Sequence, residues 1–156
     1  MSINSPALER PELIAEMADR LGSQCVVVGV DSKRAGDDWV VHQYTGDAAA
    51  SRGSGRRTLD WIIEAQTLGA GEIVLNCMDE DGVRQGYDIA QLSAARSRLT
   101  IPLVASGGAG AASHFVDVFQ QAGVSGALAA SVFHTGALAI PELKTVLAGA
   151  GIEVRP

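Results

Sequence analysis

The stretch GEIVLNCMDEDGVRQG, residues 71–86, decides the fold class of this chain. Its apolar run predicts a buried strand over residues 72–76, and the acidic and glycine residues after it predict a loop before the next helix. Similar small-residue strand ends follow at SGGAG, residues 106–110, and AAS, residues 129–131. Strand ends of this kind are typical of parallel βα barrels, which build their sites at the C-terminal ends of their strands.

The rest of the chain repeats this strand and helix pattern. We expect helices over residues 8–21, 58–68, 88–98, 114–121 and 141–148, and strands over residues 24–30, 72–76, 102–105 and 126–129. Residues 39–44 alternate like a hairpin arm, and residues 45–57 are expected to form an exposed, mobile loop. One helix followed by four strand–helix units predicts an open α/β sheet or half of a (β/α)₈ barrel, which usually has ~250 residues.

Composition narrows the function classes. The 156 residues are 47% apolar with a net charge of −6, which fits a single domain with an aliphatic core and argues against nucleic-acid or anionic membrane partners. Cys25 and Cys77 are expected in buried strands, as in a cytoplasmic protein without disulfides. We expect no signal segment, membrane span or cofactor, and His42, His114 and His134 lack a metal-ligand spacing.

Two features at the strand ends carry possible chemistry. Asp31 and Asp81 stand where barrel enzymes place catalytic carboxylates, although Asp31 could instead cap a loop and Asp81 could form a turn with Gly82. The SGGAG and AAS loops offer backbone amides that fit a phosphate, although a glycine-rich loop can also be a flexible turn.

Longer motifs resemble a known family. They are VVVGVDSKR (26–34), QYTGD (43–47), TLDW (58–61), the region 69–88, PLVASGGAG (102–110) and GALAASVFH (126–134). In order and spacing they resemble the cyclase subunit of imidazole glycerol phosphate synthase, from histidine biosynthesis. The resemblance implies the second half of a TIM barrel, with the end of strand four and helix four in residues 1–22 and units five to eight in residues 23–156.

The resemblance also implies roles for individual residues. Asp31 resembles the catalytic aspartate of strand five, whereas the strand-one aspartate has no counterpart. Glu72 resembles one member of the charged gate of an ammonia channel. The residues implied to bind substrate phosphate are Asp81, Gly82, Ser106, Gly107, Gly108, Ala130 and Ser131 at one end, and Asn4 and Ser5 at the other. The implied reaction is the ammonia-dependent cyclisation of a ribulosyl aminoimidazole-carboxamide nucleotide to imidazole glycerol phosphate, without a metal or cofactor.

A half barrel would expose its sheet edges, so we expect the chain to associate. The partner could be a second copy, giving a homodimer or a higher even oligomer, or a separate N-terminal half. The family's glutaminase docks on both halves, so we do not expect a complete docking face here. Three functions remain open: a phosphate-binding, self-associating module with little activity alone, an enzyme active as a homodimer or with an N-terminal half, and a truncated or engineered fragment without activity.

Overall fold

The computed structural model describes residues 1–47 and 49–155. Its strands are β1 (Ser2–Ile3), β2 (Val27–Ala35), β3 (Asp38–Gln43), β4 (Arg52–Arg57), β5 (Glu72–Cys77), β6 (Leu103–Ser106) and β7 (Gly126–Leu128). Its α-helices are α1 (Ser5–Glu9), α2 (Glu12–Leu21), α3 (Thr58–Thr67), α4 (Ile89–Arg96), α5 (Ala112–Asp117), α6 (Ser131–His134) and α7 (Ile140–Gly149). A 3₁₀ turn spans Ser23–Cys25, and a π-helical turn spans Val118–Ala122.

The strands form one sheet in the order β4-β3-β2-β5-β6-β7. The strands β2, β5, β6 and β7 run parallel, and β1 pairs in parallel with the first residues of β2. The hairpin strands β3 and β4 extend the sheet antiparallel, beside the far end of β2. Successive parallel strands joined by helices confirm the expected α/β architecture and are consistent with part of a (β/α)₈ barrel.

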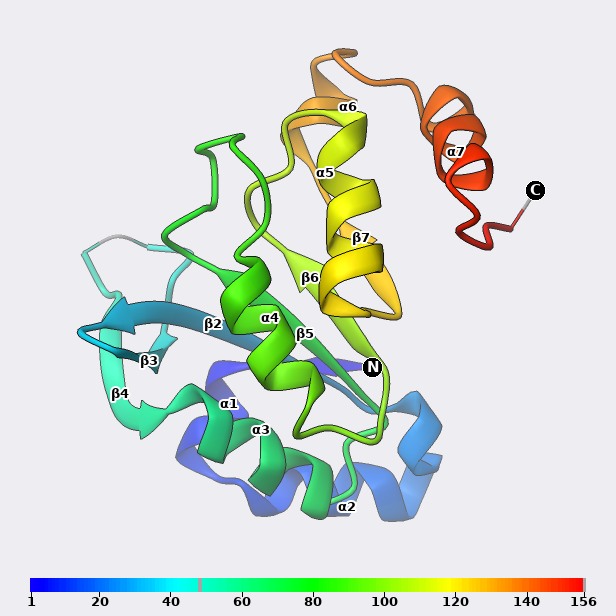
Figure 1. The fold of residues 1–156 in the computed structure, drawn as a ribbon. Helices are drawn as coiled ribbons and strands as arrows, with labels where there is room; N and C mark the ends of the chain where they lie inside the picture. Colours follow the sequence, from blue (N-terminus) through cyan, green and yellow to red (C-terminus); the bar gives the residue numbers. More distant parts are fainter. Residues whose placement is uncertain (48, 156) are drawn as a thin grey trace.

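The two faces of the sheet differ in burial. Along β5, Ile73, Leu75 and Cys77 are buried, whereas the alternate residues Glu72, Val74 and Asn76 are only partly buried. Side chains alternate between the faces of a strand, so one face is covered by helices and the other is open in part. In Figure 1, α4 and α5 lie on the same side of β5 and β6.

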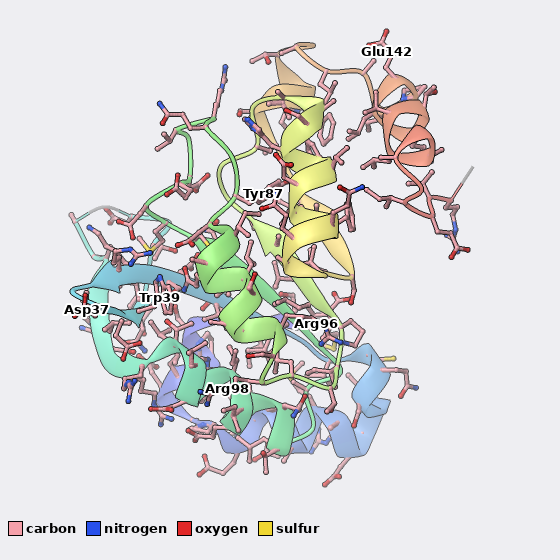
Figure 2. All side chains as sticks on the ribbon, viewed as in Figure 1. Asp37, Trp39, Tyr87, Arg96, Arg98 and Glu142 are labelled. Atoms are coloured by element: carbon pink, nitrogen blue, oxygen red, sulfur yellow. The ribbon has the colours of Figure 1, made fainter. Side chains whose placement is uncertain are left out.

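Helix packing on the covered face accounts for the core. Trp61 and Ile62 of α3, Leu92 of α4 and Phe115 of α5 are at most 2% exposed. Tyr87 lies between α4 and α5 in Figure 2, and its ring meets the Phe115 ring edge-on at 5.7 Å. Aromatic pairs prefer this arrangement. None of the described helices has the length and apolar character that a membrane span requires.

Several sequence expectations are wrong in detail. The strand expected over 24–30 begins later and continues to Ala35, because its far end pairs with β3, and it is only partly buried on one face. The expected helix over 8–21 breaks between α1 and α2, where Pro11 disfavours a helical Arg10. The expected loop over 45–57 ends in strand β4, since the backbone there pairs with β3 despite two glycines.

Two short elements also differ from expectation. The helix expected over 114–121 begins two residues earlier and changes to a π-helical turn at Val118. The short helix α6, directly after the AAS loop, was not expected. Four residues are too few to show a helical period in the sequence.

Candidate functional site

Asp31 is the centre of a hydrogen-bonded cluster in the middle of β2, near the end of the parallel pairing of β2 with β5. Its side chain is buried, with 8% exposed. The oxygen Oδ2 accepts hydrogen bonds from Asn4 Nδ2 at 2.8 Å and Thr45 Oγ1 at 2.6 Å, and Oδ1 accepts one from Asn76 Nδ2 at 2.9 Å. Three donors from separate segments therefore fix the orientation of this carboxylate.

Local backbone structure brings Asn4 to Asp31. The pairing of β1 with Val27 and Val28 places the end of β1 beside β2. Asn4 then lies over Gly29, where an added Cβ would be 3.6 Å from the Asn4 side chain. Within the described residues, the buried Asn4 Oδ1 has no hydrogen-bond partner. Asn4 therefore keeps an acceptor free next to the carboxylate.

A pocket of about 300 Å³ opens at the C-terminal ends of β5, β6 and β7. Its lining includes the seven residues expected to form a phosphate site at this end: Asp81, Gly82, Ser106, Gly107, Gly108, Ala130 and Ser131. The structure thus brings together the three loops that the sequence singled out. Its other lining residues are Asn76, Ala109, Leu128 and Ala129.

Close backbone contacts hold two of these loops together. The amide of Gly86 donates to the carbonyl of Gly108 at 2.9 Å. A Cβ on Gly108 would lie 2.0 Å from the Gly86 oxygen, and one on Gly110 would lie 2.1 Å from the Arg84 oxygen. Gly108 also has a φ of +108°, which disfavours other residues. These glycines are therefore required for packing the β5–α4 loop against the β6–α5 loop.

Asn76 connects the pocket to Asp31. Its side chain donates to the Asp31 carboxylate, and the residue also lines the pocket. The pairing of Asp31 with Asn76, and of Asn76 with Ser106, places all three on one row of the sheet. Asp31 itself is not among the lining residues, and Asn76 links its carboxylate to the pocket.

Comparison of the sequence with known proteins identifies the family of this chain. A family model described as histidine biosynthesis protein matches residues 1–139. The chain belongs to this family.

Among its relatives, proteins named imidazole glycerol phosphate synthase subunit HisF are 64% identical over 156 residues. They come from Stenotrophomonas maltophilia (strain K279a) and Xanthomonas oryzae pv. oryzae (strain MAFF 311018), among others. The matches cover 99% of this chain but 60% of each relative. The chain thus spans about three fifths of the length of the HisF proteins it matches.

The remaining predicted site residues lie outside the pocket in this member of the histidine biosynthesis protein family. Ser5 Oγ accepts a hydrogen bond from the backbone amide of Tyr44 at 3.0 Å. Glu72 begins β5 and pairs with Val27, at the opposite end of the sheet from the Asp31 cluster. The structure therefore places Asn4 and Ser5 near Asp31, and Glu72 far from it.

Sequence reasoning missed Asn76 and Thr45 as partners of Asp31. Asn76 lies inside a strand, where a polar residue on the open face is visible only once the register with β2 is known. Thr45 lies in QYTGD, which we interpreted as family signature and mobile loop without assigning it a contact. Asp31 follows one expected strand and Asn76 ends the next. Aligning these two strand ends would have identified Asn76 as a neighbour of Asp31.

The two cysteines differ in environment. Cys77 is buried as expected, and burial, with the nearby carboxylates of Asp88, Glu80 and Asp79, raises the pKa of its thiol well above the ordinary range. Cys25 is exposed in the 3₁₀ turn, so its expected place in a buried strand is wrong. The chain leaves α2 at Gly22 and makes this turn before the strand begins.

Other polar residues considered from the sequence have structural contacts. His114 Nδ1 accepts a hydrogen bond from the Gly110 amide at 3.1 Å, whereas His134 is exposed at the end of α6. The Arg34 guanidinium lies 5.2 Å from the centre of the Trp39 ring. Figure 2 shows Trp39 and Asp37 on the β2–β3 hairpin.

Proposed function

We propose that this chain supplies the C-terminal half of a HisF-type cyclase and binds substrate phosphate in the pocket beside Asp31. The observation that carries the proposal is the continuity of the pocket, lined by the seven expected phosphate-contacting residues, with the Asp31 cluster through Asn76. The full reaction would convert a ribulosyl aminoimidazole-carboxamide nucleotide and ammonia to imidazole glycerol phosphate and a released aminoimidazole-carboxamide nucleotide. The names of the relatives support the assignment to this pathway.

The proposed phosphate site depends on backbone amides. Asp81 is the only charged residue among those lining the described pocket, and no lysine or arginine lines it. A phosphate can be bound without a cation where a loop of small residues turns several backbone N–H groups toward it. Gly107 and Gly108, with φ of +90° and +108°, provide such a loop.

The proposed role of Asp31 is proton transfer. The two oxygens of its carboxylate differ in the number of hydrogen bonds they accept. Oδ2 accepts two, and Oδ1 accepts one from Asn76. This arrangement leaves Oδ1 with unused acceptor capacity on the side of the pocket. A carboxylate held in this way can take a proton from a substrate whose phosphate lies in the pocket, provided that the reacting atom comes within hydrogen-bond distance.

The resemblance implies a second acid–base group, the strand-one aspartate, which these 156 residues do not contain, and in this proposal another segment or chain supplies it. Association with another chain would bring in such a group, and the edges of the sheet favour association. In the described sheet, β7 pairs only with β6, and β4 only with β3, while one sheet face is open. Exposed edges of this kind favour pairing with another chain. The proposed partner is an N-terminal half barrel, or a second copy that brings another Asp31. Binding of the family's glutaminase would need the completed barrel.

Turnover with an ammonium salt tests this function. We would measure carboxamide nucleotide release by the chain alone and after mixing with the N-terminal two fifths of the S. maltophilia HisF. Turnover that appears on mixing and is lost in Asp31→Asn is the expected result. Turnover by the chain alone would favour the homodimer. If neither sample turns over and phosphorus NMR detects no phosphate binding, the proposed function is wrong.

A further inference from the structure

Three fully buried polar side chains lie on the covered side of the sheet, behind Asp31. Ser32 of β2 and Thr58, the first residue of α3, have no exposed surface, and Gln91 of α4 is 1% exposed. The helices that carry Thr58 and Gln91 also bury apolar side chains, including Trp61 of α3 and Leu92 of α4. The proposed chemistry uses none of the three polar residues.

These side chains bond to one another. Ser32 Oγ lies 2.7 Å from Thr58 Oγ1, and Gln91 Nε2 donates a hydrogen bond to Ser32 Oγ. Gln91 is itself held at the start of α4, where its backbone amide donates to Asp88 Oδ1 at 2.9 Å. Leaving a buried hydroxyl without hydrogen-bond partners costs free energy. This arrangement therefore disfavours any shift of β2 against the two helices.

Ser32 links this network to the site. It directly follows Asp31, so the two side chains point to opposite faces of β2. The Ser32 carbonyl accepts a hydrogen bond of 2.9 Å from the amide of Met78, the first residue of the loop that carries Asp81. Movement of Ser32 would therefore move both the Asp31 carboxylate and the start of a pocket loop.

We propose that Ser32 is a positioning residue for Asp31, and that Thr58 and Gln91 hold it in place. The network fixes the depth and rotation of β2 at Asp31, so that the carboxylate meets the amides of Asn4 and Asn76. The catalytic meaning of this role rests on the proposed function. The orientation of Asp31 does not, and it can be measured without turnover.

The test follows the side-chain amides of Asn4 and Asn76 by proton–nitrogen NMR. In Ser32→Ala, we expect the amide protons that point at Asp31 to exchange with water about tenfold faster, as a weakened charge-assisted hydrogen bond requires. Ser32→Thr, which restores a hydroxyl, should return exchange toward the wild-type rate. Thr58→Val, which removes one partner and keeps the side-chain shape, should act like Ser32→Ala and serves if Ser32→Ala does not fold.

Val28→Ala is the matched control. Val28 is fully buried on the same face of the same strand, so this variant weakens the core without touching the polar network. Unchanged amides in Val28→Ala support positioning. Equal changes in Val28→Ala and Ser32→Ala, or unchanged amides in folded Ser32→Ala and Thr58→Val, would overturn it.

Kinetics separate this inference from the proposed function. With a complementing N-terminal half, Ser32→Ala should lower kcat about tenfold and leave KM unchanged, since Asp31 acts in the transition state and the phosphate pocket binds the substrate. A rise in KM with an unchanged kcat would count against positioning. If the wild type shows neither turnover nor phosphate binding but the amides respond as expected, positioning is supported and the proposed function is refuted.

Discussion

Gly108 shows at the scale of one residue how backbone contact shapes this site. Its missing side chain allows the carbonyl of Gly86 to approach, and this contact joins the loop carrying Asp81 to the loop carrying Ser106. The sequence indicated a phosphate loop from the run of small residues. It did not indicate that the same glycines serve loop packing, because that contact depends on residues more than twenty positions apart.

Replacing Gly108 by alanine should therefore destabilise the protein. The new Cβ would collide with a backbone oxygen at a positive φ, which should reduce the free energy of unfolding by about 3 kcal/mol. Gly123→Ala is the control, since Gly123 also has a positive φ of +64° but nothing within 4 Å of the added atom. That change should cost about 1 kcal/mol. Urea unfolding measures both, and equal losses would contradict the packing role.

The two cysteines should differ in reactivity. Cys25 is exposed, whereas burial of Cys77 raises the pKa of its thiol, so that little thiolate forms at neutral pH. An aromatic disulfide reagent should modify one thiol per folded chain rapidly and the second only after denaturation. Cys25→Ser should remove the rapid phase. A rapid phase that persists in this variant would show that Cys77 is accessible.

At the scale of elements, the start of α4 illustrates a local signal that the sequence does carry. Asp88 caps this helix, with its carboxylate accepting the Gln91 amide. The sequence predicted the helix to begin at 88, and the structure confirms this start within one residue. In contrast, β4 has no comparable local signal: RGSGRR at residues 52–57 is depleted in strand-forming residues, and pairing with β3 determines its conformation.

Asp88→Ala should weaken α4 and the protein. Loss of an N-cap hydrogen bond costs about 1 kcal/mol, while asparagine preserves most of it. Asp88→Ala should thus lower the thermal midpoint measured by circular dichroism, and Asp88→Asn should lower it less. Asp19→Ala, at an exposed position in the last turn of α2, is the control and should have little effect. Similar losses in Asp88→Ala and Asp19→Ala would argue against the cap.

At the scale of the whole molecule, the contrast between the two sheet faces is the main feature. The covered face holds the apolar core, and the open face holds Asp31, Asn76 and Ser106 together with partly buried valines. Parallel strands are usually buried on both faces, which is why the sequence predicted full burial of residues 24–30. Single-strand patterns cannot show whether enough neighbouring elements are present to cover both faces.

Association through the open face should be sensitive to charge. Val104 is partly buried on that face, in the same row as Val74 and Gly126. Val104→Lys should shift the mass measured by light scattering from an even-numbered oligomer toward the monomer, because a lysine is costly to bury there. Ala90→Lys, on the exposed side of α4, is the control and should leave the mass unchanged. A folded wild-type monomer would contradict association altogether.

The site draws on the chain in two different ways. The pocket is built from residues 76–131, one contiguous segment, whereas the donors to Asp31 come from positions 4, 45 and 76. If recombination transferred this segment to another protein, the pocket lining would go with it, whereas Asp31 and two of its three donors would stay behind. The pocket lining and the setting of the Asp31 carboxylate can therefore be inherited separately.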